Sequence, residues 1–193
     1  MTLHETSVLG DHLRRSQRGL AALQPELARL ERWGAILRLR LDQGGRLLVA
    51  GNGGSAALAC HLTGELVGRY DRERPPYSAL TLTADPAALT AIGNDYGYDE
   101  VFARQVAAHG RPGDVLLALS TSGRSTNLLR ATAEGRRQGL VLWAMTGPAP
   151  NPLAAAVDDA LPIPCTGTPN VQDVQQVAVH LLCMAFEMAG EQA

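Results

Sequence analysis

Four hydroxyl side chains lie within six residues in the segment STSGRS, at Ser120, Thr121, Ser122 and Ser125. A helical pattern follows directly, so the first N–H groups of that helix lack partners and its dipole favours an anion. The hydroxyls add hydrogen-bond donors, and the guanidinium of Arg124 can pair with a phosphate. The segment therefore predicts either a phosphate site or an ordinary serine-capped helix, because Ser and Thr are also preferred N-caps.

A second polar turn, GNGGS at residues 51–55, offers backbone rather than hydroxyl groups. Asn52, Gly53 and Gly54 could let a ligand approach the main chain, although glycine also serves tight turns that hold no ligand. The turn does not match GxGxxG and lacks the downstream spacing of a dinucleotide site, so nicotinamide binding is not predicted. Two such turns at one edge of a sheet favour a small phosphorylated ligand that spans both.

Side chains that could act as acids, bases or metal ligands recur at helical spacing in two other segments. His61 and Glu65 are four residues apart, and Gln172, Gln176 and His180 share one helical stripe. Together these groups could bind a divalent metal or divide acid and base roles. A surface hydrogen bond is the plainer interpretation of the first pair, and the sequence alone does not bring the two helices together.

Two further candidates, the pair Asn94 and Asp95 and the single residue Cys60, are explained without a direct role in chemistry. Asn94 and Asp95 lie just beyond a short helical pattern in IGNDYGYDE, where turns and caps commonly use these residue types. Cys60 is adjacent to His61, but neighbouring helical residues point about 100° apart, so we exclude it as a further ligand.

Apolar runs alternate with helical patterns and predict the elements that position these residues. The predicted strands cover residues 46–50, 78–82, 115–119, 140–146 and 159–163. They are continuous apolar runs, typical of a parallel sheet buried on both faces. A last helix is predicted at 171–188. We predict an α/β fold with a doubly wound, flavodoxin-like, five-stranded parallel sheet, in which residues 44–193 form the main domain. Ligands bind outside the carboxyl ends of such strands, where both polar turns fall.

Residues 1–43 predict one or two amphipathic helices that precede this domain. Leu20, Leu23, Leu27 and Leu30 recur at helical spacing, and Pro25 predicts a break or a helix first turn. These apolar helices have no evident burial partner in the chain, which favours a role in oligomerisation.

Composition excludes several classes of function. The chain has 193 residues and a formal charge of −2, so no basic field indicates nucleic acid. All 17 basic residues are arginines, which excludes Schiff-base catalysis, a P-loop lysine and a lysine general base. No apolar run of spanning length and no signal-peptide layout is found, so a membrane partner is not predicted. Three cysteines without metal-type pairing predict reduced thiols and a cytoplasmic protein.

Several motifs considered together resemble those of a known family. The matching segments lie between about residue 46 and residue 187, and they are GNGGSAA, HLTGELVGRY, RPP, GNDYGYDEVFARQV, GDVLLALSTSGRS, and Gln172 with His180. In this combination they resemble the sugar isomerase (SIS) domain family, and within it the phosphoheptose isomerases. Their specificity lies in the combination rather than in any single motif.

The resemblance implies roles for these positions. It places the phosphate in the STSGRS turn and gives these substrate-binding residues: Asn52, Gly53, Gly54, Glu65, Asn94, Asp95, Ser120, Thr121, Ser122, Ser125 and Gln172. It places one Zn²⁺ per subunit at His61, Glu65, Gln172 and His180, with Glu65 and His180 as the acid–base pair. The implied reaction converts sedoheptulose 7-phosphate to D-glycero-D-manno-heptose 7-phosphate, at the start of nucleotide-activated heptose biosynthesis. Family members are usually homotetramers that share active-site residues, and Arg69 either reaches across such an interface or is solvated.

The chain departs from the family pattern at three positions. Leu58 stands where relatives usually carry Asp, Arg124 replaces the usual Asn, and Pro169 replaces an acidic residue found in some members. Two other readings use the same fold: a non-catalytic relative that binds the replication initiator DnaA, and a sugar-phosphate sensor without turnover. The DnaA-binding relative lacks the acid–base pair, so the presence of Glu65 and His180 favours the enzyme.

Overall fold

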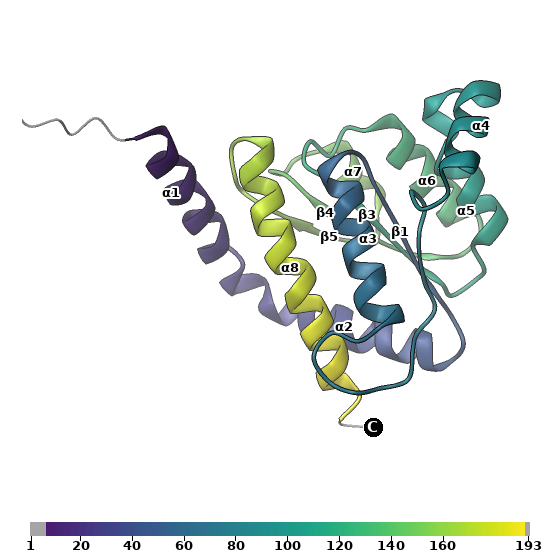
Figure 1. Cartoon of the computed structure of the whole chain (residues 1–193), viewed down its shortest axis with the longest axis horizontal. Coiled ribbons are helices and arrows are strands. Elements are labelled where there is room, and N and C mark those ends of the chain that lie inside the picture. Colours follow the sequence, from purple (N-terminus) through teal and green to yellow (C-terminus); the bar gives the residue numbers. More distant parts are fainter. Residues whose placement is uncertain (1–6, 192–193) are drawn as a thin grey trace, which may run out of the picture.

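The computed structural model describes residues 7–191, and a five-stranded parallel sheet lies at its centre (Figure 1). The strand order is β2-β1-β3-β4-β5, which confirms the flavodoxin-like winding. The strands are β1 (Leu47–Gly51), β2 (Ala79–Thr81), β3 (Val115–Ser120), β4 (Val141–Thr146) and β5 (Asp159–Pro162). Every neighbouring pair is parallel. Each strand lies within a residue or two of its predicted range, because buried parallel strands are marked by uninterrupted apolar runs.

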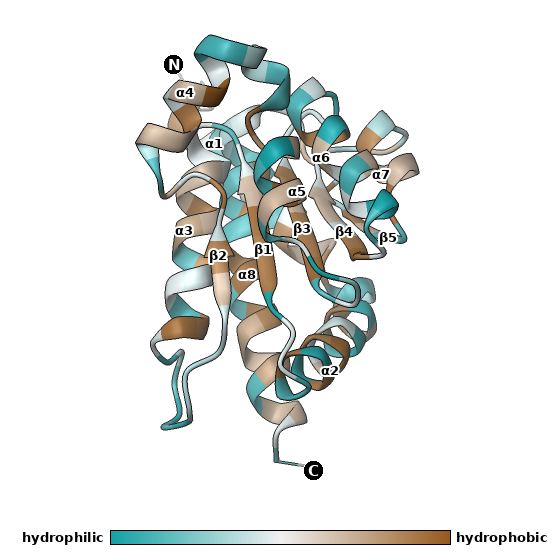
Figure 2. Cartoon of the chain, turned by 90° about the vertical axis from the view of Figure 1, so that its right-hand side faces the viewer, coloured by the Kyte–Doolittle hydropathy of each residue, from teal (hydrophilic) through white to brown (hydrophobic). Residues whose placement is uncertain are grey.

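Helices cover both faces of the sheet, and successive strand residues alternate between the two cores. In β1, Leu47 and Val49 face one helical layer, and Leu48 and Ala50 face the other. The first layer contains α2 (Leu27–Asp42), α3 (Gly54–Val67) and α8 (Thr168–Ala189). The second contains α4 (Pro86–Tyr96), η2 (Tyr98–Glu100), α5 (Ala103–His109), α6 (Thr126–Arg137) and α7 (Pro152–Ala156). Figure 2 shows the apolar strands between these more polar helices.

The two N-terminal helices differ in how far they are buried. After α1 (Val8–Ala21), Pro25 lies in the short η1 (Gln24–Glu26), so the predicted break is confirmed. The expectation that both helices lack a burial partner is wrong for α2. Its Trp33 is 1% exposed and stacks on Trp143 of β4, with ring centroids 4.7 Å apart. Helix α1 leaves Val8, Leu9 and Leu13 exposed, whereas the large apolar side chain exposed on α2 is Leu39.

The two polar turns lie side by side because they end neighbouring strands. Gly51, the last residue of β1, is in register with Leu119 of β3. The strand order reverses direction between these two strands, and this switch point is where doubly wound folds bind ligands. Within residues 7–191, no helix is both long enough and apolar enough to cross a bilayer.

Candidate active site

The serine turn between β3 and α6 leaves the start of α6 open. Ser125 is the N-cap residue, yet its side chain accepts no hydrogen bond from the first helical turn. Its hydroxyl instead lies 3.4 Å from Ser120 Oγ, which also accepts the N–H of Gly123 at 3.0 Å. The alternative of an ordinary serine cap therefore does not describe this helix. Its N-terminal N–H groups and dipole remain available to an anion.

A small hollow joins the serine turn to the glycine turn. Its volume is about 50 Å³, and it is lined by Asn52, Ser55, Leu119, Ser120, Thr121, Ser122 and Ser125. Arg124 is exposed at the tip of the turn, where its backbone N–H donates to Ser122 Oγ at 3.2 Å. All four predicted hydroxyl residues therefore line one cavity at the start of a helix.

The glycine turn brings its backbone against α8. Gly53 has φ 56° and ψ −122°, a conformation that L side chains rarely adopt. A Cβ on Gly54 would lie 2.3 Å from Nε2 of Gln172. The absence of a side chain at Gly54 thus lets the Gln172 amide lie directly over the turn, among the predicted substrate-binding residues.

Asn52 is held by two residues that the sequence analysis did not identify. It exchanges two hydrogen bonds with the buried Asn127 of α6, at 3.0 and 2.9 Å. Its Oδ1 also accepts the hydroxyl hydrogen of Tyr98 at 2.9 Å. Asn127 thereby ties the glycine turn to the helix that follows the serine turn. The predicted sugar contacts Asn94 and Asp95 are exposed at the end of α4, where they hydrogen-bond to each other at 2.8 Å.

Helices α3 and α8 bring the predicted acid–base residues together. Figure 1 shows the two helices side by side. Nε2 of His61 and Nε2 of His180 are 2.9 Å apart, and Glu65 Oε1 is 3.5 Å from the same His61 nitrogen. Gln176 approaches His180 Nε2 at 2.9 Å. The ring of Tyr70 packs beside that of His180, with centroids 5.7 Å apart.

Gln172 does not join this cluster within one chain. It precedes His180 by eight residues, about 12 Å along a helix at 1.5 Å per residue, and it lies at the glycine turn instead. The predicted four-residue metal set is therefore divided in a single chain. Cys60 lies apart from this cluster, with Sγ 3.6 Å from Thr83 Oγ1.

The comparisons with known proteins identify the family. The SIS domain model matches residues 12–147. The phosphoheptose isomerase of Streptomyces coelicolor is 54% identical over 99% of this chain and 82% of its own length. The chain belongs to the phosphoheptose isomerase family of SIS domain proteins. The relative from Thiobacillus denitrificans is 42% identical over 97% of this chain and 96% of its own length. The structure of phosphoheptose isomerase GmhA from Neisseria gonorrhoeae is 35% identical and superposes with a TM-score of 0.86, over 97% of this chain and 100% of that one.

The metal expected of a phosphoheptose isomerase suits the donor chemistry of the histidine cluster. Imidazole nitrogen and carboxylate oxygen are zinc ligands, and His61 Nε2 lies 2.9 Å from His180 Nε2 and 3.5 Å from Glu65 Oε1. Across residues 7–191, however, no three His, Cys, Asp or Glu side chains already form a metal-binding group. The two imidazole nitrogens face each other in a hydrogen bond, and Gln172 lies elsewhere.

Cys183 is buried one turn after His180 on α8. Burial raises the pKa of its thiol to about 12, and the nearby carboxylates of Glu65 and Glu187 add to the rise. The thiol of the chain without metal therefore stays protonated near neutral pH.

Proposed function

We propose that the chain is a phosphoheptose isomerase that converts sedoheptulose 7-phosphate to D-glycero-D-manno-heptose 7-phosphate. The observation that carries this proposal is the convergence of His61, Glu65 and His180 on two facing helices. A binding protein without turnover needs a phosphate hollow but has no need of this cluster. The family relationship supports the same reaction.

The reaction moves a proton between two neighbouring carbons of an open-chain sugar. The carboxylate of Glu65 takes a proton from C1 of the ketose, which gives an enediol, and returns it to C2 to give the aldose. His180 opens the sugar ring and carries a proton between the two oxygens. Gln176 and Tyr70, which contact His180, hold its ring in place.

The phosphate is held without any lysine. The serine turn supplies hydroxyl groups, the open N–H groups at the start of α6, and the dipole of a 12-residue helix. The glycine turn lies beside it, where Asn52 and Gln172 can hydrogen-bond sugar hydroxyls. Arg124 adds a positive charge at the tip of the turn.

One Zn²⁺ per subunit is part of the proposal. His61, Glu65 and His180 would hold it, with Gln172 of another copy of the chain as the fourth ligand. The bound ion would polarise the sugar carbonyl and hydroxyl oxygens.

A homotetramer is proposed because the two halves of the site lie apart in one chain. Glu65 is 11 residues after Gly54 on α3, about 16 Å along the helix. C1 of an extended seven-carbon sugar phosphate lies only roughly 10 Å from its phosphorus, at about 1.5 Å per bond. Glu65 and His180 of one copy would therefore serve the serine turn of another. Exposed apolar side chains on α8, at Val177, Met184 and Met188, suit burial between copies.

The proposed compartment is the cytoplasm. The three cysteines are unpaired in the structure, as is usual in a reducing environment.

Turnover of sedoheptulose 7-phosphate by zinc-loaded protein tests the reaction. We expect conversion by the natural chain, followed by NMR of the sugar, and loss of conversion in Glu65→Gln and in His180→Gln. Cys60→Ser is the matched control on the same helix and should retain activity. Binding of the sugar phosphate without conversion by the natural chain would refute the isomerase and favour a sensor.

A further inference from the structure

Arg74, from the RPP motif, holds the end of the helix that carries Glu65. Its guanidinium donates hydrogen bonds to the carbonyl oxygens of Glu65 at 2.5 Å, Leu66 at 2.9 Å and Gly68 at 3.3 Å. The last carbonyls of a helix have no partner within the helix, and a cation there also complements the helix dipole. Arg74 therefore fixes the position of the last turn of α3.

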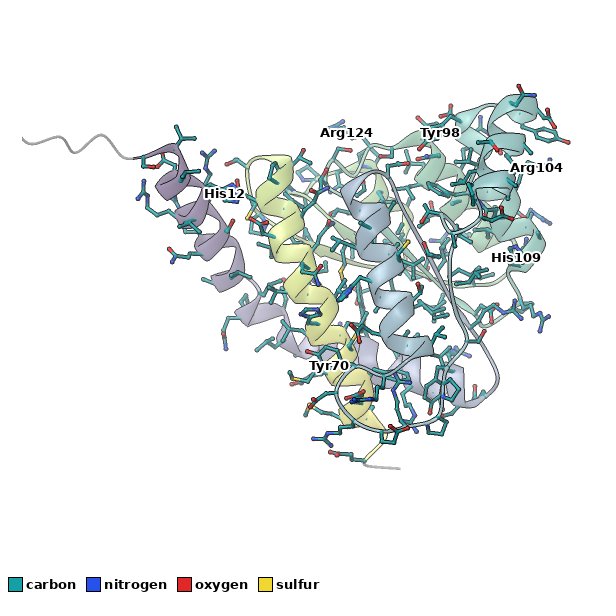
Figure 3. All side chains as sticks on the ribbon, viewed as in Figure 1. His12, Tyr70, Tyr98, Arg104, His109 and Arg124 are labelled. Carbon is teal, nitrogen blue, oxygen red and sulfur yellow. The ribbon has the colours of Figure 1, made fainter. Side chains whose placement is uncertain are left out.

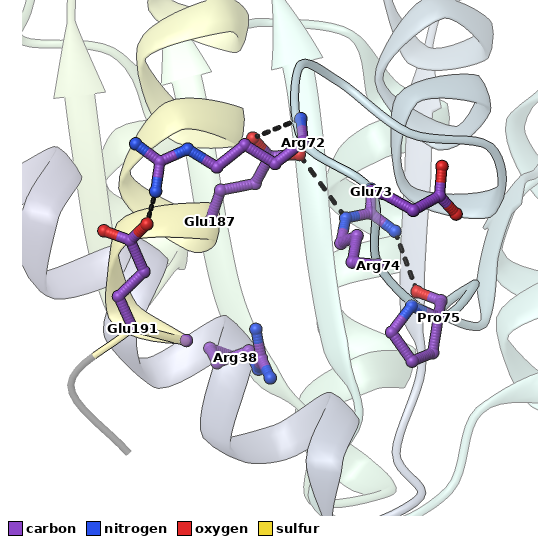
Figure 4. A pocket seen from close by; sticks show the side chains of 8 residues that line it. Arg38, Arg72, Glu73, Arg74, Pro75, Glu187 and Glu191 are labelled. Atoms are coloured by element: carbon purple, nitrogen blue, oxygen red, sulfur yellow. Dashed lines mark hydrogen bonds and ion pairs between the residues drawn. The ribbon is translucent and has the colours of Figure 1, made fainter.

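Glu187 binds the same arginine from the other helix of the site. Its Oε1 lies 3.5 Å from Arg74 Nε (Figure 4). Its two oxygens also accept the backbone N–H groups of Asp71 and Arg72 at 3.3 Å. Glu187 follows His180 by seven residues, two turns along α8 and on the same face. One ion pair thus joins α3, α8 and the loop between α3 and β2.

Both charges of this pair are buried. The side chains of Arg74 and Glu187 are 8% and 6% exposed, and Arg74 Nε forms no hydrogen bond. The guanidinium also lies over the rings of Tyr77 and Phe186, at 5.4 and 5.7 Å from their centroids. Apolar residues of similar volume often stabilise such a position equally well. Stability alone therefore does not explain why the chain has a buried ion pair at this position rather than two apolar side chains.

The location of the pair suggests what it does. Helices α3 and α8 meet at His61 and His180, and the ion pair of Arg74 and Glu187 links their ends a second time. Arg74 binds the carbonyl of Glu65, the residue assigned to carbon deprotonation. A slide of one helix along the other would break the contacts of Arg74 and separate the two histidines together.

We propose that Arg74 and Glu187 are positioning residues that set the register of α3 on α8, and with it the geometry of Glu65 and His180. This inference rests on the isomerase proposed above. It predicts that loss of the pair lowers the rate of the chemical step more than it lowers stability or substrate binding.

The test replaces the pair by apolar residues of similar size, in Arg74→Met/Glu187→Leu. We expect a melting temperature lowered by only a few degrees, because the carbonyls that Arg74 binds lose their donor. We expect an unchanged KM and a kcat reduced roughly tenfold to hundredfold, because small misplacements of reacting groups cost rates of this order. Glu134→Leu/Arg137→Met, which removes a surface ion pair of α6, is the matched control and should retain kcat. If the double variant fails to fold, Arg74→Lys keeps the charge but not the planar fork that spans three carbonyls, and it should lower kcat in the same way.

Histidine NMR gives a readout that does not depend on activity. The chain has five histidines, and the imidazole signals of His61 and His180 report their shared hydrogen bond. We expect these two signals to shift in the variants while those of His12 and His109, on other helices (Figure 3), stay unchanged. A lower melting temperature with unchanged kcat and unchanged signals would overturn the proposal. Failure of the natural chain to turn over substrate would refute the isomerase and leave the NMR test of register intact.

Discussion

At the scale of single residues, the histidine pair is the centre of the proposed zinc site. Nε2 of His61 and Nε2 of His180 are 2.9 Å apart and share a hydrogen bond. Zinc would replace the hydrogen bond and draw in the carboxylate of Glu65.

We therefore expect one zinc ion per chain after dialysis, measured by mass spectrometry of the metal. His61→Ala should lose most of it, because it removes a central donor. Cys60→Ala, one residue away on a different face of α3, should keep the metal. Equal zinc content in the two variants would contradict the assignment.

Cys183 gives a second prediction at this scale, because its pKa is about 12 against an ordinary 9.0. Between these values the unfolded chain releases the thiol proton and the folded chain keeps it, so the free energy of unfolding falls as pH rises. Burial also raises the pKa values of Tyr70 and Tyr77, and these act in the same direction at higher pH. Cys183→Ala should flatten the alkaline decline without removing it. Urea unfolding below and above the ordinary thiol pKa measures this, and equal slopes in variant and natural chain would contradict it.

At the scale of elements, two glycines allow close helix contacts with different consequences. A Cβ on Gly54 would meet only the end of the flexible Gln172 side chain, at 2.3 Å from Nε2. A Cβ on Gly34 would lie 2.5 Å from the backbone carbonyl carbon of Ala185, where α2 crosses α8. The first contact can be relieved by moving a side chain, and the second requires a helix to move.

Gly54→Ala should therefore raise KM and leave stability nearly unchanged, because it displaces a substrate contact. Gly34→Ala should cost about 1–3 kcal/mol of stability, as overpacking usually does. Urea unfolding and steady-state kinetics of both variants separate the two effects. A larger loss of stability in Gly54→Ala than in Gly34→Ala would contradict this prediction.

The elements themselves could be predicted from local patterns, but the links between them could not. Apolar runs indicate β1 and β3, and residue types indicate the serine and glycine turns. By contrast, the hydrogen bonds of Asn52 join residues 75 and 46 positions apart, and neither Asn127 nor Tyr98 carries a local signal for them. Gln172 shares a helical stripe with His180, yet the rise of α8 separates the two side chains. A stripe specifies a face of a helix and not a position along it.

At the scale of the whole molecule, the distance between the serine turn and Glu65 predicts that each active site is shared between two copies of the chain. Two variants, each damaged in one half of the site, can test this. Glu65→Gln removes the base and leaves the serine turn intact. Ser122→Asp keeps the base and places a carboxylate where the phosphate would bind. Each variant should be inactive when it is expressed alone.

When the two variants are co-expressed, they should recover part of the natural activity, because some sites then combine an intact serine turn from one copy with Glu65 from another. If each chain carried a complete site of its own, every site in the mixture would contain one of the two lesions and no activity would return. Size-exclusion chromatography with light scattering, run on the same samples, establishes that mixed oligomers have formed, so that a lack of recovery counts against shared sites.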